Sequence, residues 1–173
     1  MNKVKTLALL MGAVLGISLL SSCHPPAQGQ NGTLNLNQPA PDFQLEDLSN
    51  NLISLSDYKG EPIYLNYWAT TCPACVEEMP YIQAVYDEWS KRGLRVLTVN
   101  AGEDTATVKS FLQKNQYTMP VAVDGSGEVA EKYNIYYIPV SVFIDRQGVL
   151  RSKIIGAFPD KAAIDRQINV IMP

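Results

Sequence analysis

Two cysteines separated by two residues, Cys72 and Cys75, are the side chains whose types and spacing could do chemistry. They follow an apolar, strand-like run at 63–68 and open a stretch whose apolar residues recur at helical spacing. A Cys-x-x-Cys pair at such a junction is typical of a redox-active dithiol. A cysteine at a helix N-terminus faces unpaired N–H groups and the positive end of the helix dipole, and both stabilise its thiolate. The sequence therefore predicts thiol–disulfide exchange.

Two other uses of a Cys-x-x-Cys pair remain open at this point: a structural disulfide and half of a zinc site. Structural zinc sites usually combine two such pairs, or one pair with histidines. This chain has one pair and a single histidine, His24, which lies far from it along the sequence. We therefore expect redox chemistry carried by the cysteines themselves, with no metal and no cofactor.

The third cysteine, Cys23, follows a segment with the layout of a secretory signal. Lys3 and Lys5 give a basic start, and residues 6–20 are uncharged and mostly apolar. This run is shorter than the roughly 20 apolar residues that a transmembrane helix needs. Leu20-Ser-Ser-Cys23 resembles a bacterial lipoprotein signal, so we expect residues 1–22 to be removed and Cys23 to anchor the chain in a lipid bilayer. Ordinary cleavage near the same point is the alternative.

Composition and charge place the rest of the chain among ordinary exported globular domains. The chain has 14 basic and 17 acidic side chains, and the leader holds two of the basic ones, so the mild acidity argues against binding to nucleic acid. Residues 23–40 are uncharged and rich in Pro, Gln, Asn and Gly, which predicts a flexible, lipid-anchored tether. Residues 41–173 have the length of a single domain, so we expect them to fold as one.

The order of apolar patterns within residues 41–173 predicts an α/β fold. Strand-like and helical stretches alternate and end in a hairpin followed by a helix, which predicts a mixed central sheet with helices on both faces. A turn signal at 49–51 adds an N-terminal β-hairpin. We expect strands at 43–45, 52–55, 62–68, 94–99, 120–123, 140–144 and 149–155, and helices at 73–89, 105–116, 126–133 and 160–171.

From about Ala40 to the end, the sequence resembles the ResA/TlpA group of membrane-tethered proteins with a thioredoxin-like fold. Single segments are weakly specific, but their order over the whole domain is specific. The segments are Ala40-Pro-Asp-Phe43, Leu55-Ser-Asp-Tyr-Lys-Gly60, Leu65-Asn-Tyr-Trp-Ala69, Cys72-Pro-Ala-Cys75, Glu77-Glu-Met-Pro80, Val99-Asn100, Gly102-Glu103, Ile138-Pro139, Phe143-Ile-Asp145 and Gly148.

The resemblance implies a disulfide reductase that works outside the cytoplasm, in the periplasm or on the outer face of a plasma membrane. Its expected substrates are exported proteins with disulfides, such as the Cys-x-x-Cys-His haem site of apocytochrome c during cytochrome c maturation. A membrane thiol donor of the CcdA/DsbD type would supply the electrons.

The resemblance also assigns roles to residues of the motif. Cys72 is implied as the nucleophile and Cys75 as the resolving thiol. Glu78 matches a buried family glutamate that accepts and donates the proton of the second thiol. Its alternative is a solvated helix glutamate, a role for which Glu77 is the better candidate. Asn66 stands where thioredoxins keep a buried aspartate, and Glu78 could fill the place that this change leaves.

The expected substrate-binding residues surround the cysteines. Pro139 matches the family's cis-proline, which offers backbone to an extended substrate, and Ile138, Trp68 and Thr71 complete the set. Two departures from the family pattern lie on this surface: Thr71 replaces the usual Trp, and Pro139-Val-Ser replaces Pro-Thr-Thr. Both lie where a partner would dock, so they bear on the identity of the partner and leave the cysteine chemistry unchanged.

Three alternatives to a reductase differ in what they require. An oxidase that installs disulfides differs only in its reduction potential. A copper-binding assembly factor would use Cys72 and Cys75 as soft ligands, although related copper carriers have wider cysteine spacing and a downstream histidine. A peroxidase fits least, because Leu65 and Ala69 stand where peroxiredoxins need Pro and Thr.

Overall fold

The computed structural model describes residues 34–172. The predicted signal peptide at 1–22 and the predicted lipid anchor Cys23 therefore lie outside the described residues. Among the helices of the described part, none is long and apolar enough to cross a membrane.

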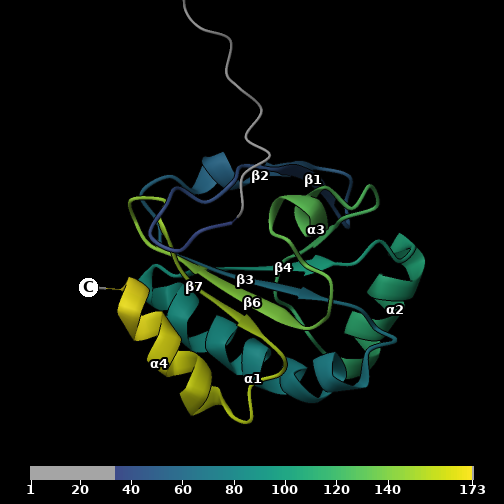
Figure 1. Cartoon of the computed structure of the whole chain (residues 1–173). Helices are drawn as coiled ribbons and strands as arrows, with labels where there is room; N and C mark the ends of the chain where they lie inside the picture. The colour runs from purple at the N-terminus through teal and green to yellow at the C-terminus, as the bar shows by residue number, and fades with distance from the viewer. Residues whose placement is uncertain (1–33, 173) are drawn as a thin grey trace, which may run out of the picture. The chain divides into compact units, whose positions relative to one another are not determined.

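One seven-stranded mixed sheet organises the described chain, with strand order β2-β1-β5-β4-β3-β6-β7 (Figure 1). The three strands β5, β4 and β3 run parallel, and the strands on either side of them pair antiparallel. The predicted N-terminal hairpin, β1 and β2, extends the sheet through β5. The strands are β1 (Gln44–Asp47), β2 (Leu52–Ser54), β3 (Ile63–Trp68), β4 (Arg95–Asn100), β5 (Val121–Val123), β6 (Val140–Ile144) and β7 (Leu150–Ile155).

Helices cover both faces of the sheet, as predicted (Figure 1). Alternate residues of β3 point to opposite faces. Tyr64 and Trp68 join the apolar cluster under α1, α2 and α4, whereas Leu65 and Tyr67 join the cluster that includes Val129 of α3. The helices are α1 (Pro73–Trp89), α2 (Thr105–Asn115), α3 (Glu128–Lys132) and α4 (Lys161–Ile171), with 3₁₀ turns η1 (Leu55–Tyr58) and η2 (Ser90–Arg92).

The central strand β3 ends just before the cysteine motif, so the motif lies at the carboxyl end of the parallel strands. All six of its residues are buried, which explains its nearly continuous apolar sequence. Trp68 at its end pairs with Asn100 at the end of β4, and Tyr67 pairs with Val140 at the start of β6. The segments that follow β3 and β4 and the one that precedes β6 therefore meet at one place, where Cys72 caps the start of α1.

The folded part begins a few residues earlier than predicted. Residues 23–40 were expected to form a flexible tether, but the Asn37 amide donates to the Leu150 carbonyl at 2.8 Å and the Ala40 amide donates to the Gly148 carbonyl at 2.9 Å. This segment is thus bound through its backbone at the β6–β7 hairpin. Composition could not reveal this, because backbone pairing does not depend on apolar side chains.

The helix predicted at 126–133 is shorter in the structure, where α3 covers Glu128–Lys132. Gly127 precedes it with a φ of 76°, a left-handed conformation that glycine adopts at little cost and that cannot continue a helix backwards. The other helices and strands agree with the predicted bounds to within about two residues.

Candidate redox site

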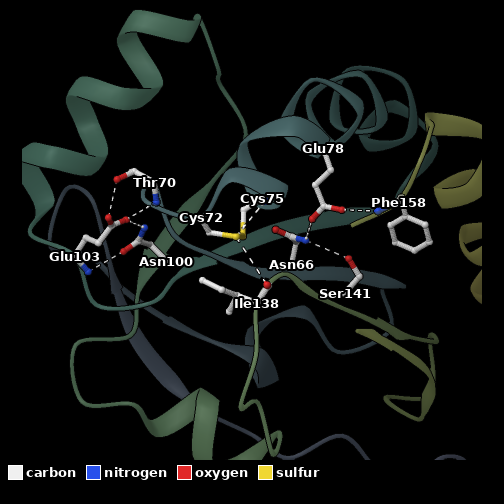
Figure 2. Close-up of a disulfide and its surroundings, with 10 residues drawn as sticks. All are labelled: Asn66, Thr70, Cys72, Cys75, Glu78, Asn100, Glu103, Ile138, Ser141 and Phe158. Atoms are coloured by element: carbon white, nitrogen blue, oxygen red, sulfur yellow. Dashed lines mark hydrogen bonds between the residues drawn. A yellow bond between two sulfur atoms is a disulfide. The ribbon is translucent and has the colours of Figure 1, made fainter. Parts of the chain in front are cut away.

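Cys72 and Cys75 form a disulfide with a Cα–Cα distance of 5.2 Å, so the structure represents the oxidised protein. Cys72 is partly exposed, whereas Cys75 is fully buried. Figure 2 shows the bond at the start of α1, beside the loop that carries Ile138. Cys72 is therefore the sulfur that a partner can reach.

The N-terminus of α1 is built around the Cys72 side chain. Cys72 is the N-cap residue, its Sγ accepts a hydrogen bond from the Cys75 amide at 3.2 Å, and its carbonyl accepts from the Val76 amide at 3.1 Å. Pro73 occupies the first helical position, where its missing N–H leaves nothing unsatisfied. After reduction, the same amide and the helix dipole would stabilise a thiolate at Cys72.

The Ile138–Pro139 peptide bond is cis, which confirms the conformation that the resemblance implied for Pro139. Cys72 Sγ lies 3.8 Å from the Ile138 carbonyl oxygen. A disulfide sulfur carries no hydrogen, so this contact becomes a possible hydrogen bond only in the reduced protein. The backbone before β6 therefore runs directly alongside the more exposed sulfur.

Glu78 lies on the buried side of α1, one turn beyond Cys75, while its neighbour Glu77 is exposed. Its carboxylate accepts two hydrogen bonds, from Asn66 Nδ2 at 2.8 Å and from the Phe158 amide at 2.9 Å. Burial raises the pKa of Glu78 above its usual value, although both hydrogen bonds act in the opposite direction. Glu78 thus lies directly beside Asn66, in the place that the sequence predicts for it.

A second carboxylate, Glu103, was not among the predicted site residues. It accepts from the Thr70 amide at 2.7 Å, from the Thr70 hydroxyl at 2.6 Å and from Asn100 Nδ2 at 2.7 Å. Burial alone would raise the pKa of Glu103, but these hydrogen bonds lower it overall. Glu103 thus ties the end of β4 to the segment just before Cys72 (Figure 2).

A signal for Glu103 was present in the sequence. Asn100 is the last residue of β4, and Glu103 lies three residues beyond it. Because β4 runs parallel to β3, the carboxyl ends of the two strands lie at the same edge of the sheet. A polar pair there is therefore placed to reach the loop that follows β3.

The structure separates the four predicted substrate-binding residues. Thr71 is exposed, and the backbone of Ile138 and Pro139 adjoins Cys72. Trp68 is fully buried and its ring packs at a tilt against Phe111, with a centroid distance of 5.3 Å, so the predicted substrate contact of Trp68 does not fit the structure. The strand position that places this ring in the core also keeps it away from any partner.

Comparison with known proteins agrees with this arrangement. The model of the AhpC/TSA family matches residues 36–153. Thiol-disulfide oxidoreductase ResA of Geobacillus kaustophilus is 37% identical over 134 residues, which cover 78% of this chain and 76% of the relative. ResA of Geobacillus thermodenitrificans is 32% identical over 165 residues, which cover 95% of this chain and 92% of the relative.

Solved structures give the same result for the fold. The pneumococcal exposed lipoprotein thioredoxin from Streptococcus pneumoniae is 33% identical, with a TM-score of 0.66 over 75% of this chain and 99% of that one. A thioredoxin-family thiol:disulfide interchange protein from Chlorobium tepidum is 26% identical, with a TM-score of 0.72 over 82% of this chain and 100% of that one. The chain is therefore a thiol-disulfide oxidoreductase with a thioredoxin-like fold that belongs to the AhpC/TSA family and to its ResA-type members.

Proposed function

We propose that this protein is an extracytoplasmic disulfide reductase that works through the Cys72/Cys75 dithiol. Its substrates are exported proteins that carry disulfides, with the haem-binding Cys-x-x-Cys-His segment of apocytochrome c as the leading candidate. A membrane thiol donor of the CcdA/DsbD type returns the electrons. The observation that carries the proposal is the unequal burial of the two sulfurs at the start of α1.

Unequal burial supports a fixed order of events. In the reduced protein, the accessible Cys72 thiolate attacks a sulfur of the substrate disulfide, a mixed disulfide forms, and the other substrate sulfur leaves as a thiolate that takes up a proton. Cys75 then loses its proton and attacks Cys72 Sγ. This step releases the second substrate thiolate and leaves the Cys72–Cys75 disulfide seen in the structure.

Glu78 is the proposed acceptor of the Cys75 proton and its donor in the reverse step. It lies three residues beyond Cys75 on the buried face of α1, and its raised pKa brings it closer to the pH at which a carboxylate works well as a general base. Thr71 and the Ile138–Pro139 backbone form the proposed contact surface for an extended substrate.

The charges around the disulfide favour reduction over oxidation. DsbA is a strong oxidant because its reduced form is stabilised. Here the Pro73-Ala74 dipeptide between the cysteines is uncharged, and two carboxyl groups lie near the motif: Glu78, bonded to Asn66, and Glu103, bonded to Thr70. Negative charges disfavour a thiolate, so they stabilise the reduced form less than a cation would.

The reduction potential of the Cys72/Cys75 couple tests the proposed direction. Equilibration with a reference dithiol of known potential should give a value near that of thioredoxin, about −270 mV. A value near the approximately −120 mV of DsbA would instead assign an oxidase.

Anchoring through Cys23 is a separate part of the proposal. The relative from Streptococcus pneumoniae is described as an exposed lipoprotein, which supports the same arrangement here. Cys23→Ala should release the full-length protein from membranes without changing its rate of disulfide reduction. Unchanged membrane retention with an uncleaved leader would contradict lipidation.

A further inference from the structure

The side-chain amide of Asn66 forms hydrogen bonds through its NH₂ group but not through its oxygen. This residue lies in the middle of β3 and is fully buried. Its Nδ2 donates to Glu78 Oε1 at 2.8 Å and to Ser141 Oγ at 3.1 Å. Its Oδ1 is buried and has no hydrogen-bond partner among residues 34–172. An unpaired buried carbonyl is unfavourable and requires an explanation.

The neighbours of Asn66 determine which way its amide points. A carboxylate oxygen only accepts hydrogen bonds, so the end of Asn66 that faces Glu78 has to be the NH₂ group. Phe158 holds the other Glu78 oxygen, and the Tyr64 hydroxyl lies 3.2 Å from Ser141 Oγ, so both acceptors of the amide are themselves held in place. The Asn66 oxygen must therefore point away from Glu78. Figure 2 shows it directed toward the disulfide.

The donor that matches this oxygen appears only when the disulfide is reduced. A partner dithiol passes two electrons to the Cys72–Cys75 bond and becomes a disulfide itself. Of the two protons that its thiols release, one goes to Cys75 Sγ, and the other goes to solvent when Cys72 remains a thiolate. The reduced protein then contains a new S–H group at Cys75, a fully buried residue that solvent does not reach.

We propose that Asn66 Oδ1 accepts the hydrogen bond of the Cys75 thiol in the reduced protein. Asn66 is then a positioning residue: it does not take the proton, but it holds the S–H bond toward β3 until Cys75 gives the proton to Glu78 and attacks Cys72 Sγ as a thiolate. Glu78 fixes the amide and remains the proton acceptor. The inference rests on the proposed function, because it assumes that Cys75 is the resolving thiol.

The S–H stretching band of Cys75 tests the hydrogen bond directly. In the full-length protein with Cys23→Ala and Cys72→Ala, Cys75 is the sole thiol. Its infrared band should lie at lower frequency than in the same protein unfolded by denaturant, because hydrogen bonding weakens the S–H bond. A band at the free-thiol frequency in this parent protein would overturn the inference before any change is made at Asn66.

Substitution of Asn66 then tests whether its Oδ1 accepts the hydrogen bond of the Cys75 thiol. Asn66→Leu has nearly the same shape and should return the band to the free-thiol frequency. In the protein that retains Cys72 and Cys75, it should slow resolution of a mixed disulfide by more than the roughly fivefold expected for one hydrogen bond, because the amide bonds to Glu78 and Ser141 are lost with it. Thr98→Val is the matched control, since Thr98 is equally buried and pairs with Asn66 in the next strand but bonds to the Pro120 carbonyl. It should leave the band unchanged.

The outcomes separate this inference from the proposed function. A shifted band that moves with Asn66→Leu, in a protein that never reduces an exported substrate, would support the hydrogen bond and contradict the reductase. Normal reduction with a band that Asn66→Leu leaves in place would support the reductase and overturn the role of Asn66.

Discussion

The two sides of the Cys72–Cys75 disulfide differ in solvent access and in the surroundings of a carboxyl group. On the Cys72 side, the ionised carboxylate of Glu103 is used entirely in holding the loop before the cysteine. On the Cys75 side, the Glu78 carboxylate is fully buried and its pKa is raised. The same functional group thus anchors backbone on one side and becomes available for proton transfer on the other. Glu78 and Glu103 have the same side chain, so their different surroundings determine their different roles.

The largest effect should come from removing the titration of Glu78. Glu78→Gln keeps the shape and should slow resolution of a mixed disulfide by about a hundredfold, in the range of general acid–base catalysis. Stopped-flow fluorescence with a trapped mixed disulfide measures this rate across pH. The matched control is Glu77→Gln, one residue away and exposed. A rate–pH profile that is equal in both variants would contradict the proton-transfer role.

A smaller effect is expected at Glu103, on the opposite side of the disulfide. Glu103→Gln replaces charge-assisted hydrogen bonds to Thr70 and Asn100 and should lower the free energy of unfolding by about 1–3 kcal/mol. Urea denaturation measures the loss. Thr70→Val removes only the hydroxyl contact and should cost less than Glu103→Gln. A larger loss in Thr70→Val would mean that the carboxylate does not hold the loop.

The smallest expected difference is in how stability depends on pH, and its sign should be opposite for the two carboxylates. The raised pKa of Glu78 means that stability falls as pH rises from the unfolded-state value of about 4.5 through the higher folded value, so Glu78→Gln should reduce this fall. The lowered pKa of Glu103 gives stability that is lost as pH falls below about 4.5, so Glu103→Gln should flatten the acid limb. Chemical denaturation from pH 3 to pH 8 distinguishes the two. Shifts of the same sign would contradict the comparison.

The sequence predicted the elements and the cysteine site because those depend on local patterns. The apolar run of β3, the helical spacing after Pro73 and the turn at 49–51 are each visible within a few residues. The predicted choice of Glu78 over Glu77 as the buried glutamate is confirmed, since helical spacing places it one turn beyond Cys75.

Other features depended on contacts between distant segments and were missed. The hydrogen bonds between Thr70 and Glu103 join residues that lie 33 positions apart in the sequence. They form only because β3 and β4 pair in parallel with a fixed register. Residues 37–40 bind to the β6–β7 hairpin through backbone groups and through one side-chain hydrogen bond from Arg151 to Asn37. The burial of Trp68 follows from the helices that cover β3, which no pattern within the motif itself could reveal.

Trapping of mixed disulfides tests most directly the claim that the two sulfurs divide the work. Cys75→Ala and Cys72→Ala are compared in the full-length protein with Cys23→Ala, so that a single thiol remains in each. With a disulfide-bonded Cys-x-x-Cys-His peptide as substrate, Cys75→Ala should accumulate a mixed disulfide through Cys72, because attack proceeds while resolution cannot. Cys72→Ala should accumulate little, because Cys75 is buried. Equal trapping by the two variants would contradict the account.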